Sequence, residues 1–183
     1  MKRIKISITS KGSLNKAIEQ LEQYKKELVA KTELFVSKLL DIGINTAKEN
    51  SGAYEQYISF YKELDSNKYG CTGILIATDS KKIINRWYRG GHLVSVEVSP
   101  LLMSEFGSGW LAKVYFPSVE GEVGQGTFPG QRHAFDPNGW SWTDENGVIH
   151  HSIGEQPTHP MYSALMAMIY EINAIAREVF GNG

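Results

Sequence analysis

The chain has a single cysteine among its 183 residues and almost no net charge. Cys71 has no second cysteine with which to form an intrachain disulfide, so nothing in the sequence indicates an oxidising compartment. A formal net charge of -1 argues against a protein that coats nucleic acid, because such proteins carry a clear basic excess. No apolar run has the roughly 18 residues that a membrane span needs, and the N-terminal residues lack a signal-peptide pattern. The sequence therefore predicts a cytoplasmic protein.

The composition is that of an ordinary globular protein. The hydrophobic fraction is 42% and the charged fraction is 21%, which excludes wholesale disorder. At this length we expect residues 1–183 to form one domain with its own core. Residues 118–139 are rich in glycine and proline and have few apolar anchors, so they are predicted to be a mobile insertion loop that projects from the domain.

Two amphipathic helices are predicted. Over residues 14–48, apolar residues recur at three- and four-residue steps and share one face: Leu14, Ile18, Leu21, Leu28, Phe35, Leu39 and Ile42. A helix of that length, roughly 50 Å, exceeds what a small sheet can cover. Lys25 and Thr32 interrupt the stripe, so part of it is expected to contact a partner subunit or water. A second helix is predicted over 160–180, with Thr158 as its cap.

The caps and breaks of the first helix are also readable. Ser13 is expected to be its N-cap, and Gly43 is expected to loosen or kink its last turns. Alternating apolar and polar residues then predict strands over 2–9, 53–64, 69–78, 82–89, 93–98, 113–117, 140–143 and 148–152. Turns are expected at residues 65–67 and at Gly90 and Gly91. The predicted fold class is α+β: an antiparallel sheet of hairpins packs against a long N-terminal helix and a C-terminal helix, with a long projecting loop.

The segment PLLMSEFGSG links the predicted sheet to the loop. Ser99 is expected to cap a short helical turn, with Pro100 at its first position, that ends at Glu105-Phe106-Gly107. We interpret this segment as a hinge, in which Phe106 anchors the rim to the core and Gly107 and Gly109 release the chain. Glu105 is expected either to form a hydrogen bond to neighbouring backbone amides or to form a salt bridge between subunits.

Aromatic residues crowd the polar region that follows the hinge, and exposed aromatic residues are enriched in protein interfaces. We therefore consider five of them as candidate interface residues: Trp110, Phe128, Phe135, Trp140 and Trp142. The alternative is that Trp140 and Trp142 simply pack their ribbon onto its own domain, and the sequence leaves both interpretations open.

The histidines suggest a metal-dependent hydrolase as an alternative function. His133, His150, His151 and His159 lie in one stretch, together with several carboxylates. Zinc sites prefer two histidines three to five residues apart on one rigid element, which this stretch does not offer. Adjacent residues of a strand point to opposite faces, so His150 and His151 are not expected to share an ion. No metal, cofactor or catalytic residue is predicted.

Two short motifs carry a family resemblance. They are residues 105–109 (EFGSG), where the sheet ends, and residues 156–161 (QPTHPM) with Ala164, at the start of the C-terminal helix. With the long N-terminal helix and the hairpins, their order along nearly the whole chain resembles the tail-component or tail-completion (neck) proteins of long-tailed bacteriophages and related prophages. The chain departs from the family at residues 51–54 (SGAY), where members often have a Gly-x-Leu-like element, and in its longer, more aromatic loop.

The resemblance implies a structural virion protein and no enzyme. Such a protein joins or completes the tail at the head-tail connection as part of a homo-oligomeric ring, often sixfold, with a loop that orders on binding. The implied partners are the tail tube or tail terminator and head-completion or connector proteins, without a membrane or sequence-specific nucleic acid. The implied location is the virion, and the host cytoplasm during assembly. A small binding module of a mobile element is the remaining alternative.

Overall fold

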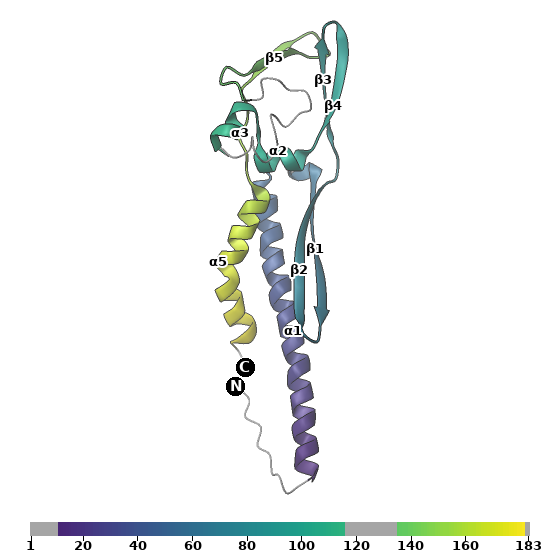
Figure 1. Ribbon diagram of the computed structural model, residues 1–183, viewed down its shortest axis with the longest axis vertical. Helices are drawn as coiled ribbons and strands as arrows, with labels where there is room; N and C mark the ends of the chain where they lie inside the picture. The colour runs from purple at the N-terminus through teal and green to yellow at the C-terminus, as the bar shows by residue number, and fades with distance from the viewer. Residues whose placement is uncertain (1–10, 116–134, 182–183) are drawn as a thin grey trace.

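A computed structural model describes residues 11–115 and 135–181 of the chain. The molecule is elongated along helix α1 (Lys11–Asn50), as Figure 1 shows. Helix α5 (Pro160–Phe180) lies along one side of α1, and the hairpin of β1 (Ile58–Asn67) and β2 (Gly70–Asp79) lies along another. This arrangement confirms the α+β fold with a long N-terminal helix, antiparallel hairpins and a C-terminal helix.

The remaining elements lie toward the end of the molecule where α5 begins (Figure 1). They are the 3₁₀-helix η1 (Gly52–Tyr57), strands β3 (Ile83–Arg89) and β4 (His92–Val98), helices α2 (Pro100–Phe106) and α3 (Gly109–Tyr115), and strands β5 (Trp140–Thr143), β6 (Ile149–Ser152) and β7 (Gly154–Glu155). Within the described residues, β1 and β2 form a two-stranded antiparallel sheet, and a four-stranded sheet has the order β4-β3-β5-β6. The predicted hairpins thus make two separate sheets.

Small residues let α1, α5 and β2 approach closely. Ala47 on α1 and Ala164 on α5 are both 0% exposed. A Cβ atom built on Gly43 would lie 2.9 Å from Sδ of Met168 on α5 and 3.0 Å from Cδ1 of Leu75 on β2. The predicted kink at Gly43 is wrong, because α1 runs unbroken to Asn50 and the missing side chain serves packing instead.

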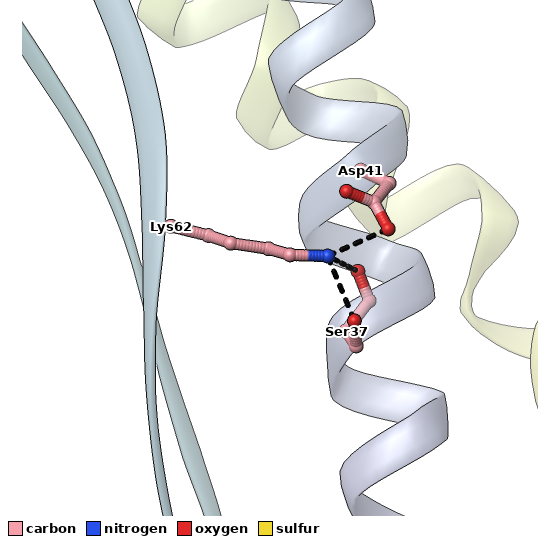
Figure 2. Close-up of polar contacts among 3 residues, drawn as sticks. All are labelled: Ser37, Asp41 and Lys62. Atoms are coloured by element: carbon pink, nitrogen blue, oxygen red, sulfur yellow. Dashed lines mark hydrogen bonds and ion pairs between the residues drawn. The ribbon is translucent and has the colours of Figure 1, made fainter.

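A lysine ties the hairpin to α1. Nζ of Lys62 on β1 donates to Oδ2 of Asp41 at 2.6 Å and to Oγ of Ser37 at 2.7 Å, as Figure 2 shows. It also reaches the backbone oxygen of Ser37 at 3.3 Å. The carboxylate is more than half exposed, so the ion pair adds little to stability, but its geometry sets how the hairpin lies along the helix.

Several element boundaries differ from the predictions. Residues 53–57 belong to η1, and the first described strand begins at Ile58. This strand pairs with β2 through Asn67↔Gly70, so the turn falls at residues 68–69 and not at 65–67. Asn67 still shapes that turn, because its Oδ1 accepts from the backbone N–H of Tyr69 at 2.9 Å. Long cross-strand pairing here outweighs the turn preference of the polar residues.

Two further differences concern helices. Residues 113–115 belong to α3 and not to a strand, because a short alternating run fits either period and the helix buries Ala112. Ser13 lies inside α1, which already includes Lys11, so it is not the N-cap. The predicted strand at 2–9 lies outside the described residues, as does 118–134 of the predicted loop. The predicted strands at 69–78, 82–89, 93–98, 140–143 and 148–152 are confirmed to within a residue or two.

The N-terminal part of α1 continues past the tip of the β1–β2 hairpin and past the C-terminal end of α5 (Figure 1). Its apolar residues are exposed there: 51% of Leu14, 48% of Ile18, 53% of Leu21 and 43% of Leu28. The expectation that the helix exceeds its sheet is therefore confirmed. In the part of the chain that the structure describes, neither α1 nor another helix has the length and hydropathy to cross a membrane.

Replacing Gly73 by alanine should destabilise the protein. A Cβ atom there would lie 2.4 Å from Cγ1 of Val36 and 2.7 Å from Cδ1 of Leu40, and a helical valine has little rotamer freedom to move aside. We expect Gly73→Ala to lower the free energy of unfolding by about 1–3 kcal/mol, measured by urea denaturation. Gly70→Ala on the same strand is the control, because nothing lies within 4 Å of its Cβ position. Equal losses in both variants would contradict this packing.

Candidate functional site

Helix α2 is fixed onto the end of strand β2. Oγ of Ser99 accepts from the backbone N–H of Leu102 at 3.2 Å, and Pro100 occupies the first helical position with its side chain fully buried. The backbone N–H of Leu101 donates to Oδ1 of Asp79 at 2.9 Å, at the C-terminal end of β2. The predicted cap and proline position are confirmed, and Asp79 adds a tertiary contact that places the helix.

Glu105, at the C-terminal end of α2, caps the first turn of α5. Its Oε2 accepts from the backbone N–H of Met161 at 2.8 Å, and its Oε1 accepts from that of Tyr162 at 3.2 Å. The first amides of a helix have no intrahelical acceptor, and a negative charge there is favoured by the helix dipole. Of the two roles expected for Glu105, the hydrogen bonds to backbone amides are confirmed, and the two amides lie 56 and 57 residues further along the chain.

The α5 N-terminus is therefore capped from outside, in place of the expected cap by Thr158. His159 occupies the N-cap position in the left-handed conformation, with φ 52°, and makes no side-chain cap hydrogen bond. The hydroxyl of Thr158 instead donates to the backbone oxygen of Ser104 at 3.2 Å. The same oxygen accepts from the backbone N–H of Thr158 at 2.8 Å and of His159 at 3.1 Å. Ser104, which is 1% exposed, thus binds Thr158 and His159, the two residues that lead into α5.

Beyond α2, two backbone segments cross in close contact. A Cβ atom on Gly107 would lie 2.4 Å from the backbone oxygen of Glu155, and one on Gly109 would lie 2.7 Å from Cα of Gly154. Both hinge glycines have positive φ and are buried, and Ser108 and Gly109 form antiparallel bridges with Glu155 and Gly154. Only glycine fits such an approach. The hinge role stays a prediction, and any motion there would have to break these bridges; Phe106 beside them is partly buried.

We call this region the junction: residues 104–109 of α2 and its C-terminal turn, together with residues 154–162. It contains both motifs on which the family resemblance rests. A third element joins it, because the hydroxyl of Tyr54 on η1 donates to Oε2 of Glu155. Burial raises the pKa of Tyr54 well above its ordinary value, and the hydrogen bond and charge of Glu155 raise it further, so the phenol stays a neutral donor.

Sequence reasoning missed Tyr54, Asp79 and Ser104 as members of this region. Tyr54 and Glu155 are 101 residues apart, and no local pattern links them. One signal in the sequence pointed to the junction: the EFGSG motif was predicted to lie at the end of a helical turn and the QPTHPM motif at the start of a helix. Such positions leave free backbone groups that need partners.

Trp110 and Trp140 contact the protein's own domain. The backbone N–H of Trp110 donates to the backbone oxygen of Ile153 at 2.8 Å. Cζ3 of Trp140 lies 2.7 Å from the Cβ position of Gly109, so this ring covers the glycine crossing. Both side chains are partly buried. The ring contact of Trp140 agrees with the packing interpretation, and an interface role for the exposed area of both residues stays a prediction.

The other candidate aromatic residues are Phe128, Phe135 and Trp142. Nζ of Lys113 lies 5.5 Å from the ring centroid of Phe135, within cation–π range. The ring of Trp142 stacks on that of His150, with centroids 5.3 Å apart. Phe128 lies outside the described residues. An interface role stays a prediction for all three.

The β5–β6 turn is held by Asp144. Its Oδ1 accepts from the backbone N–H groups of Asn146 and Val148, each at 2.9 Å, and its Oδ2 contacts Nε2 of His150 at 2.9 Å. Nε2 of His151 instead contacts the backbone oxygen of Asn138 at 2.8 Å. The two adjacent histidines therefore have different partners, as their strand positions predicted.

The suggested metal cluster was His133, His150, His151 and His159. His133 lies outside the described residues, and His159 lies at the N-terminus of α5. Within residues 11–115 and 135–181, no three histidine, cysteine or carboxylate side chains are grouped so as to hold a metal ion.

Comparison with family models, with curated proteins and with solved structures finds no match to this chain. The resemblance to phage tail-completion proteins therefore stays a prediction. The geometry of the junction and of the exposed helix faces is the basis for the function proposed below.

Glu105→Gln should weaken the cap on α5. An amide group retains one acceptor oxygen, and its NH₂ cannot accept from the second backbone N–H. We expect the free energy of unfolding to fall by about 1–2 kcal/mol, and the amides of Met161 and Tyr162 to exchange hydrogen faster. The control is Glu97→Gln, whose partner Lys82 is 3.5 Å away with both side chains more than half exposed. A stability loss no larger than in the control would contradict the capping role.

The pKa of Asp144 should lie below the ordinary aspartate value. The hydrogen bond with His150 is the largest cause, followed by the bond from the Val148 amide. Because the folded pKa is lower than the unfolded one, the stabilisation is present above the ordinary value of about 3.9 and is lost as the pH falls through the folded pKa.

NMR titration of the Asp144 carboxyl carbon measures this pKa directly. His150→Ala should raise the midpoint without restoring the ordinary value, because the backbone amides of Asn146 and Val148 still donate. His151→Ala is the matched control, and it should leave the midpoint unchanged. Equal effects of the two substitutions would rule out the His150 contact as the cause.

Proposed function

We propose that this chain is a structural virion protein that joins or completes the tail of a long-tailed phage or prophage at the head-tail connection. It acts as a subunit of a homo-oligomeric ring. The observation that supports this proposal is the junction. The EFGSG and QPTHPM motifs, which carry the resemblance to tail-completion proteins, bind each other through Ser104 and Glu105. Their co-occurrence in the sequence thus corresponds to one physical unit.

The chemistry of the junction suits a structural role. Both carboxylate oxygens of Glu105 accept from backbone amides, and the backbone oxygen of Ser104 accepts from two more. These bonds fix the direction in which α5 leaves the end of the molecule that carries the second sheet. A ring subunit needs such a rigid connection, because small errors in angle accumulate around a closed assembly.

The exposed surfaces also suit a protein that functions in an assembly. Large apolar side chains are exposed on the N-terminal part of α1 and on α5, where Tyr170 is 84% exposed and Ile169 is 52% exposed. Monomeric proteins rarely expose extended apolar patches, and such patches mark interaction sites. In the proposed ring these faces contact neighbouring subunits, while the segment at 118–139 reaches the tail tube or terminator and the connector proteins.

The role of the segment can be tested in a phage or prophage that encodes the chain. Residues 118–134 are replaced by a glycine-serine linker of equal length, and residues 135–139 are kept because the Cβ position of Gly139 lies 2.1 Å from the backbone oxygen of Ser152. We expect the purified variant to keep the thermal unfolding midpoint of the wild type. Electron microscopy of lysates should show separate heads and tails, and a wild-type copy supplied in trans should restore joined particles.

Removal of the whole gene is the broader test. Separate heads and tails are expected, as in the linker variant. Normal infectious particles without the gene would overturn the proposed function. Normal particles from the linker variant alone would overturn only the role of the segment.

A further inference from the structure

The part of α1 that no other described element covers carries a regular apolar stripe. We call Leu14, Ile18, Leu21 and Leu28 the overhang stripe; they are spaced by four, three and seven residues and are each 43–53% exposed. This spacing repeats every 3.5 residues on average, as in helices that pack lengthwise against another helix. Lys25 lies at the one intervening position of the repeat. Its aliphatic stem can follow an apolar surface while the ammonium stays in water.

The overhang stripe continues a seam that already packs against a helix. One heptad beyond Leu28 is Phe35, whose ring centroid lies 5.7 Å from that of Phe180 at the end of α5. Lys38, in the next turn of α1, forms an ion pair with Glu178. Figure 1 shows α5 ending at this level, whereas α1 continues beyond it. The stripe is thus an extension of the α1–α5 interface into a region that α5 of the same chain does not reach.

Helix α5 has a second apolar face. Its inner side contains Ala164 and Val179, which are 0% and 7% exposed. Its outer face is made of apolar residues that are 41–59% exposed: Tyr162, Leu165, Met166, Ile169 and Ile172. Residues 161–170 are apolar apart from Ser163, so this half of the helix is apolar both toward α1 and on its outer face. Among the described residues, no element covers the outer face.

We infer that the overhang stripe of one copy docks on the outer face of α5 in a second copy. The partner is assigned by continuity, because the α1 seam that the stripe extends already packs against α5 within each chain, where α5 uses its inner side and leaves its outer face exposed. One such contact covers the overhang stripe of the first copy and the outer face of α5 in the second. Because the two faces differ, the contact is head-to-tail, and it leaves one free face of each kind for the next subunit. This inference names the subunit contact of the proposed ring and rests on the proposed function only for its setting in the virion.

Sedimentation velocity of the purified full-length chain tests the contact. We expect the wild type to form oligomers whose size grows with concentration. Leu21→Glu in the overhang stripe and Ile169→Glu on the outer face should each weaken association at least about 30-fold, the effect of losing a central apolar contact. Ala30→Glu and Ala174→Glu are the matched controls, since they add the same charge at exposed positions on other sides of the same helices and should associate like the wild type.

Mixing the two variants identifies which faces meet. Leu21→Glu keeps an intact outer face, and Ile169→Glu keeps an intact overhang stripe, so an equimolar mixture should form a one-to-one complex and nothing larger. Pairing of two overhang stripes would instead leave Ile169→Glu associating like the wild type. That result, a monomeric wild type, or a mixture that stays monomeric would overturn the inference.

Circular dichroism of each variant checks that it is folded. We expect both variants to fold, because Leu21 and Ile169 are each about half exposed. If either variant loses helix content, Ile18→Gln and Met166→Gln replace the pair and must give the same pattern of monomers and complementation. Because these measurements use isolated protein, their failure is separate from the particle-joining test. Separate heads and tails after gene removal, combined with a monomeric chain, would retain the proposed function and reject this contact.

Discussion

The capping of α5 by Glu105 is the constraint on which the rest of the structure depends. The first turn of a helix presents backbone N–H groups without intrahelical acceptors. In α5 this turn begins at Pro160, whose side chain is fully buried, so the turn lies against the rest of the protein and is not fully hydrated. His159 offers no side-chain cap, so the acceptors must come from elsewhere in the chain. Glu105 supplies them, and the backbone oxygen of Ser104 binds the two residues before Pro160, so α2 must end directly beside the start of α5.

The close crossing beyond α2 follows from that constraint. Once α2 ends beside α5, the chain that leaves α2 must pass the chain that enters α5 with almost no space between the two backbones. Gly107 and Gly109 permit this passage, and Tyr54 holds the other segment through Glu155. Three residues of the EFGSG motif thus have a structural reason. Glu105 is the acceptor for the first turn of α5, and Gly107 and Gly109 adopt positive φ where the two backbones are in contact.

The same geometry gives the molecule two unlike parts. Toward the junction, α1 is covered by α5 and by the β1–β2 hairpin, and the lack of a side chain at Gly43 and Gly73 allows these elements to approach it closely. Toward its N-terminus the same helix keeps its apolar stripe but has no described helix or sheet beside it (Figure 1). In a subunit of an assembly, the covered half of such an apolar seam would stabilise the subunit, and the exposed half would be free to bind a neighbouring subunit. This combination is the physical link between the fold and the proposed ring.

The sequence by itself determined the features that depend on neighbours within a few residues. These include the long helix, the hairpin turn at Gly90 and Gly91, and the Ser99 cap followed by Pro100, because periodicity, backbone freedom and capping are local properties. Only the tertiary structure decided what Glu105 caps, where the first hairpin turns, and that residues 113–115 are helical. In each case the deciding partner lies on another element, as far away as 57 residues for Glu105, and local preferences are too weak to select among such partners.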